Sequence, residues 1–236
     1  YEGHKHTYAS LLASSIKKDI FYAREKIYTS VREKALFSEN IPTKVYDNLL
    51  SAVGENISPL HKYFSIRKRI LKLDELHIYD TSVPLVKDVQ WHVGYKDSVR
   101  KVIAALQPLG LDYTKTLEKG LLDNRWVDRY ESKGKRSGAY SSGCYDSNPF
   151  ILMNYREDDI SSMYTLAHEA GHSMHSFLAR ETQPYLYADY TIFVAEVAST
   201  FNEALLTKHL LEQDIDLNMK IFLVCREIDN LRGTLY

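Results

Sequence analysis

The stretch that decides the fold is Thr165–Leu178, TLAHEAGHSMHSFL, with HEAGH (His168–His172) at its centre. Residues four positions apart lie one above the other on the same face of an α-helix, so the imidazoles of His168 and His172 can turn toward one metal ion. The carboxylate of Glu169 then lies beside that ion. Because imidazole is a preferred ligand of Zn²⁺ and a neighbouring carboxylate can act as a general base, H-E-x-x-H predicts one zinc ion with Glu169 as the base.

The third ligand has to come from outside this motif, because a catalytic zinc ion has three protein ligands and one open position. His175 shares the helix face, but seven residues at about 1.5 Å each place it roughly 10 Å from His168, so we expect it to support the ligands or to face the substrate. Glu196 and Glu203 stand among apolar residues of the next predicted helix, where a bare carboxylate is costly. One of them can bind zinc while the other supports the ligands, and the spacing leaves both assignments open.

Composition describes an ordinary globular protein. The chain has 236 residues, of which 44% are hydrophobic and 26% charged, and its net charge is -1. This balance gives no reason to expect nucleic acid or a membrane surface as a partner, and no apolar run approaches the roughly 18 residues of a membrane span. Cys144 and Cys225 lie far apart, which favours the reducing cytoplasm over a disulfide framework. Oligomeric state is not indicated. The first residue is not Met, and the chain stops in mid-pattern at Tyr236, so we expect a piece of a longer protein.

Apolar periodicity predicts a mostly helical chain. No Gly or Pro interrupts His6–Phe37, so one long helix is expected there. The basic residues around Arg67 are interpreted as the solvated face of a helix, in preference to a nucleic-acid patch. Further helices are predicted over Thr43–Val53, Ser58–Leu73, Lys96–Leu106, Asp112–Leu122, from Ile160 to before Pro184, over Tyr190–Glu212 and from Asp216 toward Arg232. Expected core residues of the helix that carries the glutamates include Phe193, Val197, Phe201 and Leu205.

The composition changes at Arg129, where a Gly- and Ser-rich segment begins. We predict two short strands on either side of a polar turn, at Ser137–Tyr140 and Phe150–Met153. We therefore divide one continuous domain into a helical part, residues 1–128, and a zinc-binding catalytic core, residues 129–236. Small residues near such a site let a substrate backbone approach and pair as an added strand, and a plain surface hairpin is an equally good interpretation.

Four segments together resemble the oligoendopeptidase F branch of the thimet oligopeptidase family of zinc metallopeptidases. They are YEGHKHTYASLL (residues 1–12), GKRSGAYSSG (134–143), HEAGHSMHSF (168–177) and DYTIFVAEVASTFNEALL (189–206). The match runs along essentially the whole chain. It implies a mainly α, zincin-like helical fold with a small β-sheet beside the active-site helix, and a deep channel that admits short, unstructured peptides.

The resemblance also implies roles for single residues. The family pattern H-E-x-G-H-x-x-H, with a glutamate about 25 residues later, is matched by His168, Glu169, Gly171, His172, His175 and Glu196. It makes Glu196 the third ligand and Glu203 the supporting carboxylate. The family's substrate-lining strand corresponds to Ser137, Gly138, Ala139 and Tyr140. The family completes its site with a His and Tyr cluster well downstream of the glutamate, and this sequence does not contain that region.

The expected function is a zinc metalloendopeptidase that hydrolyses internal bonds of short oligopeptides. Zinc activates a water molecule, Glu169 takes its proton, and the same carboxylate returns the proton to the leaving amine. An aminopeptidase ranks lower, because no feature of the sequence captures a free N-terminus. The alternative from another class is a non-catalytic helical module that binds peptides, with structural zinc or none. Structural zinc usually has four ligands, often Cys, and Cys144 and Cys225 lack that spacing.

Overall fold

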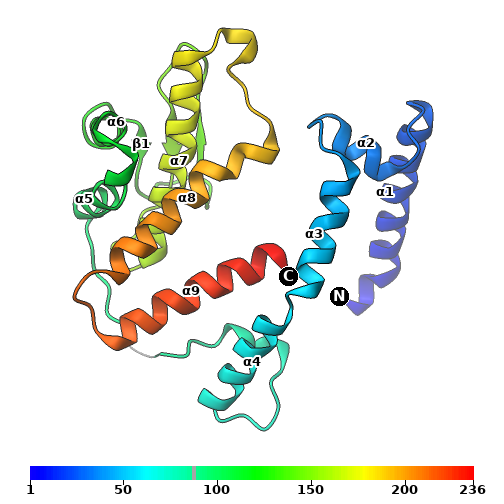
Figure 1. The fold of residues 1–236 in the computed structure, drawn as a ribbon, viewed down its shortest axis with the longest axis horizontal. Helices are drawn as coiled ribbons and strands as arrows, with labels where there is room; N and C mark the ends of the chain where they lie inside the picture. The colour runs from blue at the N-terminus through cyan, green and yellow to red at the C-terminus, as the bar shows by residue number, and fades with distance from the viewer. Residues whose placement is uncertain (87–88) are drawn as a thin grey trace. The chain divides into compact units, whose positions relative to one another are not determined.

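The computed structural model describes residues 1–86 and 89–236 and confirms a mainly α-helical fold with a small β-sheet (Figure 1). The chain forms two compact units, Tyr1–Tyr63 and Phe64–Tyr236. The composition change at Arg129 lies inside the second unit, and the division into a helical part and a catalytic core stays a prediction. Within the two described ranges, no helix is both long and apolar enough to cross a membrane.

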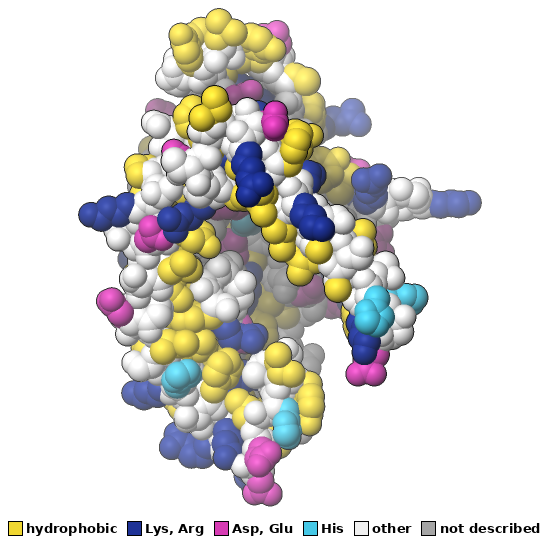
Figure 2. Space-filling view, turned by 90° about the vertical axis from the view of Figure 1, so that its right-hand side faces the viewer, with side chains coloured by type: hydrophobic (Ala, Val, Ile, Leu, Met, Phe, Trp, Pro, Cys, Tyr) yellow, Lys and Arg dark blue, Asp and Glu magenta, His cyan; other side chains and the backbone are white. Residues whose placement is uncertain are grey.

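The first unit contains η1 (Glu2–His4, a 3-10 helix), α1 (Lys5–Glu25), α2 (Val31–Phe37) and α3 (Thr43–Glu55), and α4 (Ser58–Ile70) begins in it. Its hydrophobic side chains are largely exposed. Leu11 and Leu12 of α1, for example, are each 63% exposed. Figure 2 views the molecule from the side on which α1 lies in Figure 1, and hydrophobic side chains are visible on the face shown.

The single long helix predicted over His6–Phe37 is wrong, because the chain turns between α1 and α2. Ile27 adopts a left-handed backbone with φ 62°, and the amide of Tyr28 donates to the carbonyl of Ala23 at 2.9 Å. This is the pattern of a Schellman C-cap. The next helix starts at Ser30, whose hydroxyl accepts from the amide of Glu33 at 3.0 Å. The spacing Ser30-x-x-Glu33 is a capping signal in the sequence, and it was missed because the apolar periodicity continues through it.

The solvated basic face predicted for α4 is wrong for Arg67, which is only 2% exposed. Its guanidinium donates to the backbone carbonyl of Asp80, inside η2 (Ile78–Ser82), and to that of Val83, directly after η2. A buried guanidinium needs such acceptors, and these two backbone carbonyls supply part of that need. Arg67 therefore anchors a loop instead of facing solvent.

The second unit holds the hydrophobic core and the predicted site. Its further helices are α5 (Tyr95–Ala105), η3 (Gln107–Leu109), α6 (Leu111–Leu122), α7 (Ile160–Thr182), η4 (Tyr185–Tyr187), α8 (Ile192–Leu211) and α9 (Leu217–Leu235). α7 packs along α8, and α5 packs against α6, α7 and α8 (Figure 1). Side chains with no exposure come from all four packed helices, and they include Val99, Val102, Leu117, Leu121, Met163, Leu166 and Leu206.

The core residues expected on α8 are partly wrong. Phe193, Val197 and Phe201 are 60%, 63% and 52% exposed, respectively. Leu205 packs against the core, as predicted. Since α8 is apolar on most of its circumference, its sequence does not say which side faces inward.

The sheet lies beside α7 and has the strand order β1-β3-β2, so β2 is an edge strand. β1 (Val127–Asp128) pairs parallel to β3 (Phe150–Leu152), and β2 (Tyr140–Ser142) pairs antiparallel to it. The strand predicted at Phe150–Met153 is confirmed. The one predicted at Ser137–Tyr140 is displaced, because Gly138 has φ 90° and turns the chain before the strand begins. The two-residue β1 is too short for an alternation pattern and was not predicted.

Candidate metal centre

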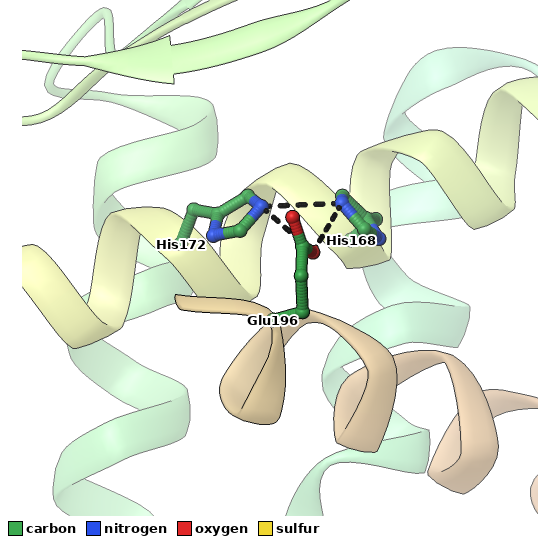
Figure 3. Close-up of side chains that lie close together, drawn as sticks. All are labelled: His168, His172 and Glu196. Atoms are coloured by element: carbon green, nitrogen blue, oxygen red, sulfur yellow. Dashed lines mark hydrogen bonds and ion pairs between the residues drawn. The ribbon is translucent and has the colours of Figure 1, made fainter. Parts of the chain in front are cut away.

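Three side chains from α7 and α8 meet at one point (Figure 3). The Nε2 atoms of His168 and His172 are 3.1 Å apart. The Oε2 atom of Glu196 lies 3.3 Å from the first of these nitrogens and 3.4 Å from the second. Bonds of about 2.0–2.1 Å from one ion at tetrahedral angles place ligand atoms roughly 3.3–3.4 Å apart. This donor triangle of two nitrogens and one oxygen therefore has the dimensions and the chemistry of a zinc site with one position left open.

The number of donors separates a catalytic from a structural site. In the part of the chain that the structure describes, the metal-type cluster consists of His168, His172 and Glu196 alone. Side-chain exposure increases from 19% at His172 to 59% at Glu196, so the triangle is open on the side of α8. A structural zinc site is closed by four ligands, whereas a catalytic one keeps a position free. Three donors equal the number of protein ligands in a catalytic zinc site.

Glu203 lies on the other nitrogen of His168. Its Oε1 atom is 2.8 Å from His168 Nδ1, and its side chain is 13% exposed. If Nδ1–H donates to this carboxylate, the Nε2 lone pair of His168 is directed into the donor triangle, as in the carboxylate–histidine–metal arrangement. The geometry thus puts Glu196 among the donors and Glu203 behind His168, which is the arrangement that the family resemblance implies.

The charges of this pair support each other. The hydrogen bond to Glu203 raises the pKa of His168 above its ordinary value, against the effect of burial. Burial alone would raise the pKa of Glu203, but the hydrogen bond from His168 and the Arg226 guanidinium outweigh it and lower the pKa of that carboxyl. For His172, burial lowers the pKa, which favours the neutral imidazole that a metal ion binds.

Glu169 is buried next to the donor triangle, with 6% of its surface exposed. Burial raises the pKa of its carboxyl; the charge of His168 opposes this rise, and that of Glu196 adds to it. No partner among the described residues hydrogen-bonds its buried Oε2 atom. A carboxylate with a raised pKa and an unused oxygen atom is suited to exchange a proton with a reacting group.

His175 lies outside the donor triangle, as the rise per residue predicts. Its ring stacks on Tyr190 with centroids 3.7 Å apart and planes at 9°, and the Tyr190 hydroxyl is 2.9 Å from Ser176 Oγ. Burial lowers the pKa of His175. The ring lines a cavity of about 680 Å³ between the end of α7, η4 and the start of α8, together with apolar residues such as Leu178 and Phe201.

The predicted substrate-lining segment lies only partly in the edge strand. Tyr140 begins β2, whereas Ser137, Gly138 and Ala139 precede it, and the carbonyl of Gly138 accepts from the side chain of Asn154 at 3.1 Å. Ser141 of this strand contacts α7: its Oγ is 2.8 Å from Ser173 Oγ, and its backbone N–H lowers the pKa of Glu169. The edge strand thus approaches α7 through the residue that follows the predicted segment.

Several supporting residues escaped the sequence analysis. Ser199 is fully buried and donates from Oγ to Glu196 Oε2 at 2.7 Å. Asn202 donates to the carbonyl of Ala167 at 3.0 Å and so ties α8 to α7. A Cβ on Gly171 would lie 2.6 Å from the Cα of Ser199, so the two helices pack at a distance that only glycine permits. The available signals in the sequence were polar residues within two turns of Glu196 on an otherwise apolar helix, and a glycine inside a helix.

A helical fold with an H-E-x-x-H helix beside a short sheet and a carboxylate on the following helix defines a zincin-like metallopeptidase fold. The chain belongs to peptidase family M3, whose family model matches residues 1–235. It is 48% identical to oligopeptidase PepF of Bacillus subtilis over 236 residues, covering 100% of this chain and 35% of that protein. It is 42% identical to an oligoendopeptidase F homolog of Borreliella burgdorferi, covering 100% of this chain and 40% of that protein.

Solved structures agree with these relatives. A crystal structure assigned to a peptidase from Chlamydophila abortus matches with a TM-score of 0.89 and 44% identity, over 99% of this chain and 39% of that one. The oligoendopeptidase-F of Enterococcus faecium matches with a TM-score of 0.67 and 29% identity, over 100% of this chain and 34% of that one. The comparisons confirm the resemblance and the fold class. The chain spans 35% to 40% of the length of these two curated relatives.

Proposed function

We propose that this protein is a zinc metalloendopeptidase that hydrolyses internal bonds of short oligopeptides. The observation that carries the proposal is the donor triangle of His168, His172 and Glu196 with the unpaired Oε2 atom of Glu169 beside it. The names of the relatives, oligopeptidase and oligoendopeptidase F, support oligopeptides as substrates. Both cysteines are free thiols, which is consistent with the reducing cytoplasm as the compartment.

Different residues hold the metal ion, orient its ligands and transfer the proton. His168, His172 and Glu196 hold one Zn²⁺, and Glu203 fixes the orientation of His168. When bound, zinc supplies Lewis acidity toward a carbonyl oxygen and lowers the pKa of water. Glu169 accepts the proton of the attacking water at its carboxylate, and it passes that proton to the amine that leaves. No covalent enzyme intermediate is needed.

The edge strand is the proposed binding place for the peptide backbone. β2 uses one side to pair with β3, and an extended peptide can add to its other side as a further strand. Tyr140 belongs to this strand, and Ser137, Gly138 and Ala139 lead into it, so we propose that they line the substrate. His175 faces the cavity beyond the donor triangle, and a contact with substrate is proposed there.

The alternative is a non-catalytic peptide-binding module with structural zinc. It predicts a fourth protein ligand, whereas the described residues provide a group of three. A functional test also separates the two. The alternative expects peptide binding without hydrolysis, and it expects no special importance for the carboxylate of Glu169.

The deciding variant is Glu169→Gln in the intact protein. Zinc content, measured by atomic absorption, should stay at the wild-type level, because Glu169 is not a donor. Hydrolysis of a quenched fluorescent peptide should fall by about 10²–10⁴-fold, the usual contribution of a general base. Glu181→Gln is the matched control, since Glu181 is an exposed residue of the same helix. Undiminished turnover by Glu169→Gln would refute the assigned role.

A further inference from the structure

Arg226 on α9 contacts Glu203, and Glu203 in turn contacts His168 of the candidate metal centre. The two carboxylate oxygens of Glu203 have different partners: Oε1 faces His168 Nδ1 at 2.8 Å, and Oε2 accepts from Arg226 Nη2 at 3.2 Å. The side chains of Glu203 and Arg226 are 13% and 22% exposed, so this ion pair is largely shielded from water. Arg226 has no place in the zinc motif and comes from a different helix than any of the donors.

Other contacts fix the guanidinium of Arg226 in place. Its central carbon lies 3.4 Å from the centroid of the Tyr164 ring, which stands one helical turn before His168 on α7. Its Nη1 atom donates to Glu227 Oε1 at 3.4 Å. The same oxygen accepts from Thr207 Oγ1 at 2.6 Å, and Thr207 Oγ1 is 2.8 Å from the Tyr164 hydroxyl.

These contacts form a closed ring across three helices. Tyr164 belongs to α7, Thr207 to α8, and Arg226 and Glu227 to α9. Hydrogen bonds in such a ring polarise one another, and each member restricts the rotamers of the next. The guanidinium is therefore held at a fixed place relative to the helix that carries the two histidines.

A shielded carboxylate requires such a partner. Burying a carboxylate is costly unless its oxygens are paired, and removing one partner of a shielded ion pair leaves an uncompensated charge. Without Arg226, one oxygen of Glu203 would lose the cation that it contacts here. The carboxylate would then be free to rotate toward water, away from His168 Nδ1.

We propose that Arg226 is a positioning residue of the metal centre: its guanidinium holds the Glu203 carboxylate in the orientation that accepts Nδ1–H of His168, and so directs His168 Nε2 into the donor triangle. This inference rests on the proposed zinc site. It makes α9 a part of that site, although α9 supplies none of the donors. Partners that support a metal ligand typically contribute 10–100-fold to metal affinity, and for Arg226, one contact further out, we expect about tenfold.

The test is a double-mutant cycle on zinc affinity, measured by competition with a chelating dye in the intact protein. Arg226→Gln should bind zinc about tenfold more weakly, and Glu203→Gln at least as weakly as that. The double variant should match Glu203→Gln alone, because Arg226 acts through Glu203. Arg232→Gln is the matched control: it removes a half-buried cation from the same helix, which pairs with Asp229 at 3.2 Å and does not contact Glu203.

A second variant separates positioning from folding. Arg226→Lys keeps the charge but cannot serve Glu203 and Glu227 together in the planar geometry of a guanidinium, so its zinc affinity should lie between those of the wild type and Arg226→Gln. Thermal melting of the metal-free variants gives the stability effect by itself. Wild-type affinity in Arg226→Gln, or losses that multiply in the double variant, would overturn the inference. A wild type that binds no zinc would overturn the proposed function as well, so the two failures are distinguishable.

Discussion

Gly171 sets how closely α7 and α8 approach each other, and its replacement by alanine is the sharpest test of how the donor triangle is built. A Cβ at this position would lie 2.6 Å from Ser199 Cα and 2.7 Å from both Ala198 O and Ser199 N. All three atoms belong to the backbone of α8, so no side chain can rotate out of the way. Since carbon atoms pack at about 3.5–4.0 Å, α8 has to move back by roughly 1 Å.

That displacement acts on the donors directly. Glu196 Oε2 is 3.3 Å and 3.4 Å from the two Nε2 atoms, and Glu203 Oε1 is 2.8 Å from His168 Nδ1. Both carboxylates belong to residues of α8, so a displacement of α8 moves both of them away from the histidines. A misplacement of about 1 Å commonly reduces activity by about 10²-fold. Overpacking should also lower the free energy of unfolding by about 1–3 kcal/mol.

Zinc affinity, peptide hydrolysis and the thermal midpoint of Gly171→Ala should therefore all decrease. Alanine is the better helix former by about 1 kcal/mol, so weakening of α7 itself cannot account for a loss. Gly233→Ala is the matched control, because Gly233 also lies in a helix of the second unit and a Cβ there would meet nothing within 4 Å. Wild-type zinc affinity and turnover in Gly171→Ala would refute the idea that this close approach sets the donor geometry.

Two further predictions concern the same donors. Ser199→Ala removes the hydroxyl that donates to Glu196 Oε2 at 2.7 Å, so zinc affinity should fall about tenfold in a dye-competition assay, and an unchanged affinity would contradict the role of Ser199. On acidification, the plot of the logarithm of zinc affinity against pH should bend downward at a pH above 6.5, the ordinary pKa of histidine, because the hydrogen bond to Glu203 raises the pKa of His168 and protons compete with zinc for its nitrogen. A bend at pH 6.5 or below would contradict that shift.

The sequence could predict what depends on local spacing. The relation of His168 to His172 follows from the helical repeat alone, and the same rise per residue excluded His175 as a ligand of the same ion. The predicted start of the last helix at Asp216 is likewise confirmed, because the Asp216 carboxylate accepts from the amide of Met219 at 2.8 Å and so caps α9. Each of these features needs only a few neighbouring residues.

The sequence could not predict what depends on the packing of distant segments. Whether Glu196 or Glu203 meets the histidines depends on the register of α8 against α7, and spacing alone left both possible. That register is set by contacts such as the one from Asn202 to the Ala167 carbonyl at 3.0 Å. Arg226 reaches Glu203 only because α9 folds back after a turn, and nothing in its own neighbourhood in the sequence indicates that. Ile27, a β-branched residue in a left-handed conformation, likewise broke a helix that its sequence favours.

Helix α8 shows why apolar patterns failed at the site itself. Apolar residues occupy most sides of this helix, and Phe193 and Val197, expected in the core, are 60% and 63% exposed. Its fully or nearly fully buried side chains include the polar ones of Ser199, Asn202 and Thr207. Because a buried polar group needs a hydrogen-bond partner, and each of these three has one, the polar residues reveal the inward side more reliably than the apolar ones. A helix that supplies a metal ligand also has to supply groups that hold this ligand in place. On α8, Ser199 and Asn202 lie within two turns of Glu196, whereas Thr207 lies further along the helix and belongs to the ring of contacts around Arg226.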